Sequence, residues 1–360
     1  MIDNSLSFSY RRRNRLRLKV AIIEASHWHV PLYLDALSRD EVEVVAVSDR
    51  EDARGHEIAR RFGCKLYASY EDLLSTESFD VAFAFGRHSD MPRIGEALIK
   101  RGKPFAMEKP CGRKAADAAR LRDLAAQQGV YVAVPLIFRL SDLLGELKAL
   151  DHSGSSSFNH IAFRFIAGSL TRYERAGSPW MLDPGAAGGG CTINLAVHFI
   201  DLFRVLTGQA ITSVSALMNH KSERADVEDY SVLTLTTEDG TIGVIETGYT
   251  FPGDANEQRE YSFTLSSEHY YLRSGDESIH IRNRSTLAEG TKTVPVRLNS
   301  DDYYPVFVER VLNDIQSGAE PIAGLADIEA VMRVIDAGYA SARAAGAPVR
   351  LEKSGTDEAR

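Results

Sequence analysis

The feature that most constrains the fold is a change of hydrophobic pattern near residue 140. From Leu18 to Val134, short apolar runs alternate with amphipathic stretches, which is the pattern of successive strand–helix–strand units. We expect strands at 19–23, 42–48, 81–85, 104–107 and 130–134, and helices at 32–38, 51–62, 92–101 and 115–128. Such units form a doubly wound parallel sheet of the Rossmann type, which binds ligands at the carboxyl ends of its strands.

The second half of the chain predicts a sheet of another kind. Strands are expected at 158–165, 211–218, 230–236, 241–249, 260–266, 270–273 and 279–282. Consecutive strands joined by tight turns form antiparallel pairs. One helix, 191–206, precedes most of these strands, and two more, 306–317 and 325–344, close the chain.

We therefore expect a chain of the α/β plus α+β class. Its parts are a basic arm at 1–17, a Rossmann-type dinucleotide-binding domain at 18–140, and a substrate-binding and oligomerisation domain at 141–360 with an open, largely antiparallel sheet. An open sheet with one uncovered face needs a partner, so a homodimer or homotetramer formed through the C-terminal sheet is expected.

Composition removes several classes of function. The 360 residues carry a formal charge of -8, which argues against a general nucleic-acid binder. No run is long enough to span a bilayer. The basic cluster Arg11–Arg17 runs into Val20–Ile23, which is too short for the apolar core of an export signal. With only Cys64, Cys111 and Cys191, we expect free thiols in a cytoplasmic protein that binds neither nucleic acid nor membrane.

Two distant stretches carry groups suited to acid–base chemistry. Glu108-Lys109-Pro110 ends an apolar strand, so the Lys109 ammonium is expected in the cleft with Glu108 orienting it. Asn194 and His198, after a triple glycine, are four residues apart and share a helix face. Histidine suits the removal of a proton from an alcohol, because its pKa lies near neutrality. The alternative is a core histidine that has Asn194 as its hydrogen-bond partner.

On these stretches the chain resembles the Gfo/Idh/MocA family, named for glucose–fructose oxidoreductase, inositol dehydrogenase and a rhizopine catabolism protein. The residues that carry the resemblance are Gly102-Lys103 with Glu108-Lys109-Pro110, Gly188-Gly189-Gly190 with Asn194 and His198, Ile200-Asp201-Leu202, and Ser341-Ala342-Arg343 with Pro348-Val349. The resemblance implies hydride transfer between a nicotinamide cofactor and a sugar, polyol or related cyclic alcohol.

The resemblance also implies roles for single residues. Lys109 and His198 are the acid–base pair that polarises the substrate oxygen, and Asn194 binds and orients a hydroxyl. Arg139 and Trp180 are substrate-cleft candidates, although packing or surface roles are as well supported by their types.

The first strand-to-helix turn departs from the family pattern, because Glu24–His29 contains no glycine. A dinucleotide turn normally reads G-x-G-x-x-G, so that backbone amides approach the pyrophosphate. Here Glu24 and Ser26 stand at the first two glycine positions, and the Glu24 carboxylate repels phosphate unless it points away.

Other residues favour nucleotide binding. Asp49 ends the second strand, where an acidic side chain accepts ribose hydroxyls, and this favours NAD over NADP. Arg50 is placed to stack on adenine and Arg87 to meet the pyrophosphate. The cofactor-binding candidates are Ser26, His27, Asp49, Arg50, Arg87 and Glu108.

Two alternatives to redox turnover stay open at this point. The first keeps the fold but uses the cleft for ligand binding, regulation, or a lyase or hydrolase reaction. The second is a metal-dependent enzyme, because several possible ligands fall on loops at one sheet edge. These residues are Glu24, His27, His29, His88 and Asp90. His27 and His29 are two residues apart in a loop, and no helix or strand fixes their geometry as metal ligands. We therefore expect no metal.

Overall fold

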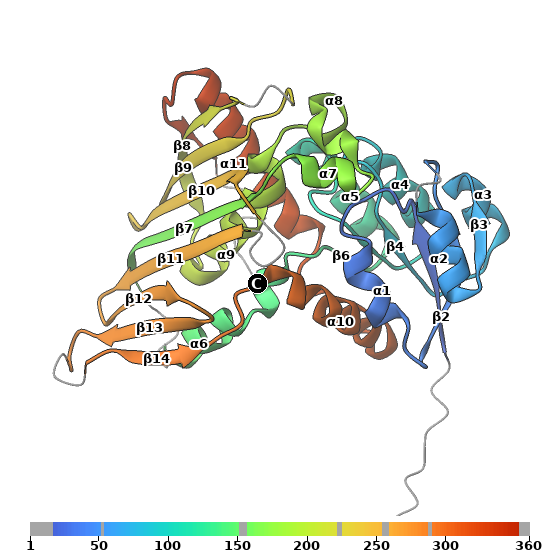
Figure 1. Cartoon of the computed structure of the whole chain (residues 1–360), viewed down its shortest axis with the longest axis horizontal. Helices are drawn as coiled ribbons and strands as arrows, with labels where there is room; N and C mark the ends of the chain where they lie inside the picture. Colours follow the sequence, from blue (N-terminus) through green and yellow to red (C-terminus); the bar gives the residue numbers. More distant parts are fainter. Residues whose placement is uncertain are drawn as a thin grey trace, which may run out of the picture.

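The computed structural model contains two β-sheets flanked by helices (Figure 1). It describes residues 17–51, 54–150, 157–221, 225–253, 259–286 and 290–352. The expected basic arm lies outside the described residues except for Arg17, whose Nε donates to the Asp40 carbonyl.

The N-terminal sheet has six parallel strands in the order β3-β2-β1-β4-β5-β6. Its strands are β1 (Leu18–Ile23), β2 (Val42–Ser48), β3 (Lys65–Tyr67), β4 (Val81–Ala84), β5 (Phe105–Met107) and β6 (Val132–Ala133). Its helices are α1 (Pro31–Leu37), α2 (Gly55–Phe62), α3 (Tyr70–Thr76), α4 (Met91–Lys100) and α5 (Ala115–Gln128). The parallel Rossmann-type sheet expected from the alternating pattern is confirmed.

Two differences from the predicted elements have local causes. Helix α2 begins at Gly55 instead of residue 51, because the Asp49 carboxylate accepts the N–H groups of Arg54 and Gly55 at 2.9 and 2.8 Å. Strand β3 and helix α3 were not expected. The three residues of β3 are exposed or half-buried, so no apolar run signals them.

The C-terminal sheet has nine strands in the order β14-β13-β12-β11-β7-β10-β9-β8-β15. They are β7 (Phe158–Gly168), β8 (Ile211–Asn219), β9 (Tyr230–Thr237), β10 (Ile242–Phe251), β11 (Arg259–Ser267), β12 (Tyr270–Gly275), β13 (Ser278–Asn283), β14 (Lys292–Pro295) and β15 (Val349–Arg350). The β7–β10 pair is parallel and the other pairs are antiparallel. The expected, largely antiparallel sheet is confirmed.

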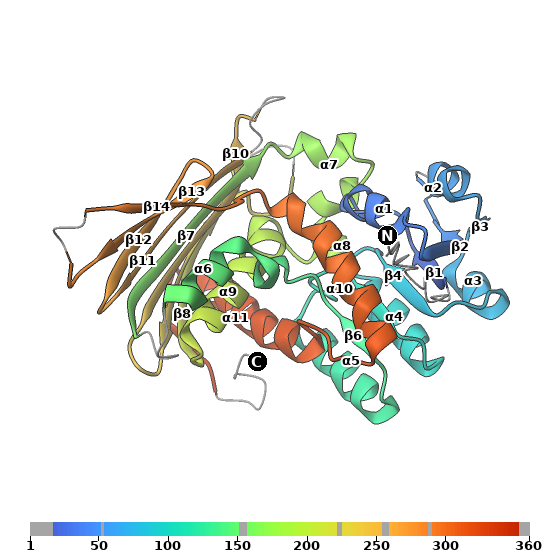
Figure 2. The same cartoon turned by 90° about the horizontal axis from the view of Figure 1, so that it is seen from below.

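Helices cover one face of this sheet, and the opposite face carries none among the described residues (Figure 2). The covering helices are α6 (Asp142–Leu150), α9 (Val197–Thr207) and α11 (Leu325–Arg343). Within the described residues, one helical stretch, Pro184–Thr207, is long and apolar enough to cross a membrane, and 89% of its most apolar window is buried inside the protein. This stretch includes α9, which packs between the sheet and α11.

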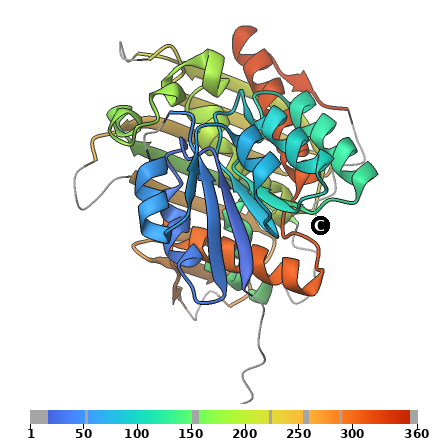
Figure 3. The same cartoon turned by 90° about the vertical axis from the view of Figure 1, so that its right-hand side faces the viewer.

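The two halves are interlocked by the end of the chain. Helix α10 (Tyr303–Ser317) packs on α1, and α11 packs on α5, so both return to the N-terminal sheet (Figure 3). The Val134 N–H donates to the Ala323 carbonyl at 3.0 Å, extending this junction along the backbone. The carboxyl ends of the parallel strands therefore face the second sheet across a continuous packed boundary.

Candidate active site

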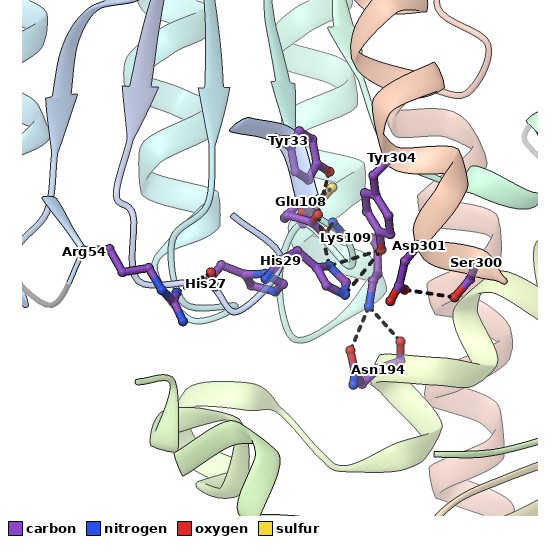
Figure 4. A network of polar contacts seen from close by, with 11 residues as sticks. His27, His29, Tyr33, Arg54, Glu108, Lys109, Asn194, Ser300, Asp301 and Tyr304 are labelled. Carbon is purple, nitrogen blue, oxygen red and sulfur yellow. Dashed lines mark hydrogen bonds and ion pairs between the residues drawn. The ribbon is translucent and has the colours of Figure 1, made fainter. Parts of the chain in front are cut away.

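Lys109 joins the two stretches that the sequence singles out. It follows β5 at the carboxyl edge of the parallel sheet and is buried. Its Nζ donates to the backbone carbonyl of Asn194 at 2.8 Å and to the Asn194 side-chain Oδ1 at 2.7 Å (Figure 4). An ammonium carries three N–H donors, so one remains for a ligand.

Asn194 is held on its other side as well. It lies in a π-helical turn, Thr192–Ala196, immediately before α9, and such turns are frequent at functional sites. Its Nδ2 donates to the hydroxyls of Tyr173 and Tyr249 at 2.7 and 2.9 Å. These contacts assign the amide orientation and fix the carbonyl oxygen toward Lys109.

His198 is on α9, four residues after Asn194, and its Nδ1 is buried without a hydrogen-bond partner among the described residues. The edge of its ring contacts Phe138 at 5.9 Å between centroids. Burial is the main reason that its pKa falls well below 6.5, with smaller contributions from the charges of Lys109 and His29. His198 is therefore neutral near pH 7 and has a free nitrogen to accept a proton.

Burial also lowers the pKa of Lys109 to about 8, although the Glu108 carboxylate acts in the opposite direction and Arg172 adds to the lowering. The ammonium thus lies close to its titration point at neutral pH. Groups with such a shift in a cleft are good acid–base candidates.

Lys109, Asn194 and His198 line one narrow cavity between the two sheets. The three predicted catalytic residues are thus brought together. The cavity's other polar residues are His29, Arg172, Arg259, Ser300, Asp301 and Tyr304.

Arg139 does not line this cavity. Its guanidinium donates to both oxygens of Asp201 at 2.8 and 2.7 Å, to Asp327 at 2.7 Å, and to the Ile322 carbonyl at 3.0 Å. All of its charge is therefore engaged in a buried network that links η1 (Ile137–Leu140), α9 and α11.

Trp180 lies against the first turn and outside the cavity lining. It is in a 3₁₀ turn, Pro179–Leu182, and its Nε1 donates to the Ser26 carbonyl at 3.3 Å. The Ser178 hydroxyl donates to the same carbonyl at 2.6 Å. Ser26 is thus tied to the C-terminal half of the chain by its backbone.

The turn itself starts at Glu24 in the left-handed region, with φ of +58°. This is the backbone conformation that glycine adopts without strain, here held by a glutamate. The carboxylate is buried, its Oε1 has no partner among the described residues, and burial raises its pKa. Arg54 closes the turn from α2 by donating to the His27 carbonyl at 2.6 Å and to the Ala25 carbonyl at 3.4 Å.

The remaining nucleotide-binding candidates surround this turn. Asp49 is buried, and its two oxygens accept three backbone N–H groups at the start of α2. Arg87 forms an ion pair with Glu51 across the sheet edge. Arg50 is exposed beside them, and only its backbone N–H reaches Glu24, at 3.5 Å.

A buried polar cluster lies behind the cavity (Figure 4). The His29 Nδ1 is 3.1 Å from a Glu108 oxygen, which also accepts the Tyr33 hydroxyl at 2.6 Å. The backbone N–H of His29 donates to the His27 Nδ1 at 3.1 Å, leaving the His27 Nε2 without a partner among the described residues. One ligand atom from each of His27, His29 and Glu108 lies within 4.8 Å of the other two.

A dinucleotide fits this edge through a donor set unlike that of a glycine-rich turn. The β1, β2 and β4 strands end side by side, and the turn keeps the left-handed start of a nucleotide-binding turn. Guanidinium groups bind phosphate oxygens well, and those of Arg50, Arg54 and Arg87 lie around this turn, where Arg54 already contacts the His27 carbonyl and Arg87 is paired with Glu51. The Asp49 oxygens already accept three backbone N–H groups, so a ribose hydroxyl would share these oxygens with those groups.

Comparison with known proteins follows the same division of the chain. Residues 19–136 match the model of an oxidoreductase family with an NAD-binding Rossmann fold, and residues 162–268 match a GFO/IDH/MocA C-terminal domain. The chain belongs to the Gfo/Idh/MocA family. The resemblance stated from Glu108-Lys109-Pro110 and the triple-glycine region is confirmed, and the N-terminal half is a nucleotide-binding Rossmann domain of this family.

Curated relatives match only in part. A trans-1,2-dihydrobenzene-1,2-diol dehydrogenase from Oryctolagus cuniculus is 29% identical over 186 residues, which is 51% of this chain and 55% of that enzyme. The rhizopine catabolism protein MocA of Rhizobium meliloti is 27% identical over 219 residues, covering 59% of this chain and 66% of MocA. The chain thus matches between 55% and 66% of the length of these Gfo/Idh/MocA relatives.

Solved structures match over nearly the whole chain. A levoglucosan dehydrogenase in complex with NADH and levoglucosan has a TM-score of 0.79 at 16% identity, covering 93% of this chain and all of that one. An Agrobacterium radiobacter oxidoreductase in complex with NAD+, L-tartaric acid and magnesium has a TM-score of 0.79 at 17% identity, over 93% and 98% of the two chains. At these identities the likeness establishes a shared Gfo/Idh/MocA fold.

The structure also places residues in the cavity that the sequence analysis did not select. Arg172 is in a five-residue helix, α7 (Thr171–Arg175). Arg259 is the first residue of β11, Asp301 lies in the 3₁₀ turn before α10, and Tyr304 lies in the first turn of α10. None of them has a motif or a periodic pattern. The one available signal is the irregular segment around 170–187, from which Arg172 comes.

Proposed function

We propose that the protein is an NAD-dependent oxidoreductase that moves a hydride between nicotinamide and an alcohol carbon of a sugar, polyol or related cyclic alcohol. The observation that carries this proposal is the convergence of Lys109, Asn194 and His198, from opposite halves of the chain, on one cavity. The names of the relatives, which are dehydrogenases and reductases of diols and sugars, support it.

In the proposed reaction, His198 and Lys109 divide the work on one substrate hydroxyl. The third N–H of Lys109 donates to the hydroxyl oxygen and stabilises negative charge that develops there. The unpaired Nδ1 of His198 accepts the hydroxyl proton, and returns it when the reaction runs as a reduction. Bound nicotinamide supplies the hydride acceptor or donor. Asn194 holds the ammonium in place through two hydrogen bonds.

The cofactor is proposed to be NAD rather than NADP. Asp49 and Glu51 put carboxylates at the end of β2, where a 2′-phosphate would be repelled. Arg54 and Arg87 would take phosphate oxygens in place of glycine amides, with Ser26 and His27 contributing from the turn and Glu108 from the end of β5. Trp180 reaches the site only through its hydrogen bond to Ser26.

The direct test is nucleotide binding followed by a substrate panel. NADH titration should give calorimetric heat and fluorescence transfer from tryptophan, more strongly than NADPH. Oxidation of sugars, polyols and inositols is then followed by absorbance of the reduced cofactor, with H198A as the inactive control. No binding of either nucleotide at millimolar concentration would reject the proposal and favour a non-redox use of the cleft.

A second candidate function is metal-dependent chemistry in the same cleft, favoured by the His27, His29 and Glu108 cluster. Burial lowers the pKa of both imidazoles well below 6.5, which keeps them neutral as metal ligands require. Elemental analysis of protein purified without added metal decides the matter. Stoichiometric metal that is lost in a His27→Ala variant supports it, and trace metal rejects it.

We also propose that the uncovered sheet face forms a homodimer or homotetramer interface. Leu217 on β8, Ile242 on β10 and Tyr271 on β12 are exposed on this face, while their strand neighbours Ala216 and Leu272 are buried. Light scattering after gel filtration tests the assembly, and a Leu217→Glu/Ile242→Glu double variant should shift it to monomer. A wild-type protein that is already monomeric would reject the proposal.

A further inference from the structure

The cavity that holds Lys109 and His198 has an excess of positive charge. Its lining includes three cationic side chains, Lys109, Arg172 and Arg259, and one carboxylate, Asp301. Arg259 and Asp301 neutralise each other in a two-point pair at 3.0 and 2.7 Å. Lys109 and Arg172 remain as cations, and the charge of Arg172 acts on Lys109 directly.

Arg172 is held by aromatic rings rather than by an acidic group. Its guanidinium lies over Trp28 at 5.1 Å, Tyr173 at 4.6 Å and Tyr249 at 5.3 Å. One Nη donates to the Tyr173 hydroxyl, and within the described part of the chain no carboxylate is paired with Arg172. Cation–π contacts position the group without cancelling its charge.

The Nε of Arg172 is buried and has no hydrogen-bond partner among the described residues. An unpaired buried donor on a charged group is costly, and a carboxylate is the acceptor that matches a guanidinium edge best. The same cavity is lined by Lys109, whose ammonium has a third N–H beyond its two bonds to Asn194, and by His198, whose buried Nδ1 has no partner among the described residues. These three open positions describe a ligand with an anionic group at one end and a hydroxyl at the other.

We infer that the substrate is a polyhydroxy carboxylate, that is, a sugar acid, whose carboxylate binds the Nε edge of Arg172 while the reacting hydroxyl lies between Lys109 and His198. The inference rests on the proposed function where it concerns the reaction of that hydroxyl. Where it concerns binding of the carboxylate, it does not depend on the proposed function. A carboxylate suits the site better than a phosphate, because the anion meets one guanidinium edge, which supplies too few hydrogen bonds for three phosphate oxygens, while the remaining Lys109 donor is assigned to the reacting hydroxyl. The bound anion also offsets the crowding of positive charge around His198.

The experiment compares matched neutral and acidic sugars. Binding is measured by calorimetry, and turnover by reduced-cofactor absorbance, for glucose with glucuronate, galactose with galacturonate, and glucose 6-phosphate as the phosphate arm. The variants are Arg172→Gln and Arg172→Lys, with Arg175→Gln as the control, since Arg175 is exposed on the same short helix.

At least one acid should bind more tightly than its neutral partner, and Arg172→Gln should weaken it on the order of 100-fold, as expected for loss of a charge-assisted pair. Arg172→Lys should recover only part of this loss, while Arg175→Gln and the neutral sugars change by less than about threefold. For the acids, kcat/KM should fall in Arg172→Gln in parallel with the loss of binding.

Three results overturn the inference: acids that bind no better than neutral sugars, an Arg172→Gln variant that weakens both equally, or preferential binding of the sugar phosphate. A sugar acid that binds through Arg172 without any turnover leaves the inference standing and removes the redox proposal instead. If neutral sugars are turned over and sugar acids are not, the redox proposal stands and the inference about the sugar acid is removed.

Discussion

Arg139 offers the sharpest test of how the structure assigns roles. The sequence made it a substrate-cleft candidate, whereas the structure encloses its guanidinium in ion pairs with Asp201 and Asp327, the side chains of Arg139 and Asp201 being 4% and 2% exposed. An Arg139→Gln substitution removes the bidentate pair and the contact to Asp327, and among the described residues the cation that remains near Asp201 is Arg204, whose Nη1 is 3.8 Å away. Removing one partner of a buried pair costs about 3 to 5 kcal/mol, and the residual Arg204 contact favours the lower end.

The assay is urea unfolding followed by circular dichroism, with Arg297→Gln as the control. Arg297 forms an equally well-shaped pair with Asp142, but its side chain is 53% exposed, so its loss should cost less than about 1 kcal/mol. An Arg139→Met/Asp201→Leu double variant should recover part of the lost stability, because it removes the more deeply buried of the two carboxylates that lose Arg139, while Asp327 stays. If Arg139→Gln keeps its stability within about 1 kcal/mol of the wild type and instead raises KM, the buried-network argument is refuted.

Further predictions concern Lys109, the first turn and the triple glycine. Lys109→Met should lower kcat/KM by about 10²- to 10⁴-fold. In the wild type, kcat/KM for oxidation should fall as pH rises through about 8, because the Lys109 ammonium is the active form. If kcat/KM rises there instead, Lys109 acts as the base. Because the pKa of Lys109 is lower in the folded state than its ordinary 10.5, the wild type should gain stability relative to Lys109→Met between about pH 8 and 10.5, measured by urea unfolding. Glu24→Gly should raise NADH affinity at least about tenfold by fluorescence titration, since it removes a repelling carboxylate at a left-handed position; equal or weaker binding would count against the assigned phosphate site. Gly190→Ala should lower thermal stability by about 2 kcal/mol or more, because its Cβ would lie 2.1 Å from the Glu228 carbonyl oxygen, and an unchanged melting temperature would contradict that packing.

The sequence predicted those parts of the site that depend on regular elements. Lys109 follows a buried strand, and His198 lies one helical turn beyond Asn194, so periodicity and spacing were enough to select them. The parallel and antiparallel sheets followed in the same way from the length and order of apolar runs.

What the sequence did not predict depends on tertiary contacts between irregular segments. Arg172 is in a one-turn helix, and its place in the proposed site depends on Trp28 and Tyr249, whose rings reach it from separate segments, as well as on its neighbour Tyr173. The sequence left a cleft role and a packing role open for Arg139 for the same reason, because its partner Asp201 is 62 residues away in the chain. The π-helical turn that frees the Asn194 carbonyl for Lys109 also has no sequence signal.

The return of α10 and α11 to the N-terminal half has a practical consequence for dissecting the molecule. Helix α10 shields apolar side chains of α1, and α11 shields those of α5, so a fragment that stops near residue 140 would leave both surfaces bare to water. Such a truncated polypeptide should aggregate and should not fold as an independent nucleotide-binding domain. The two helices within residues 303–343 are therefore needed to complete the packing of the first 140 residues.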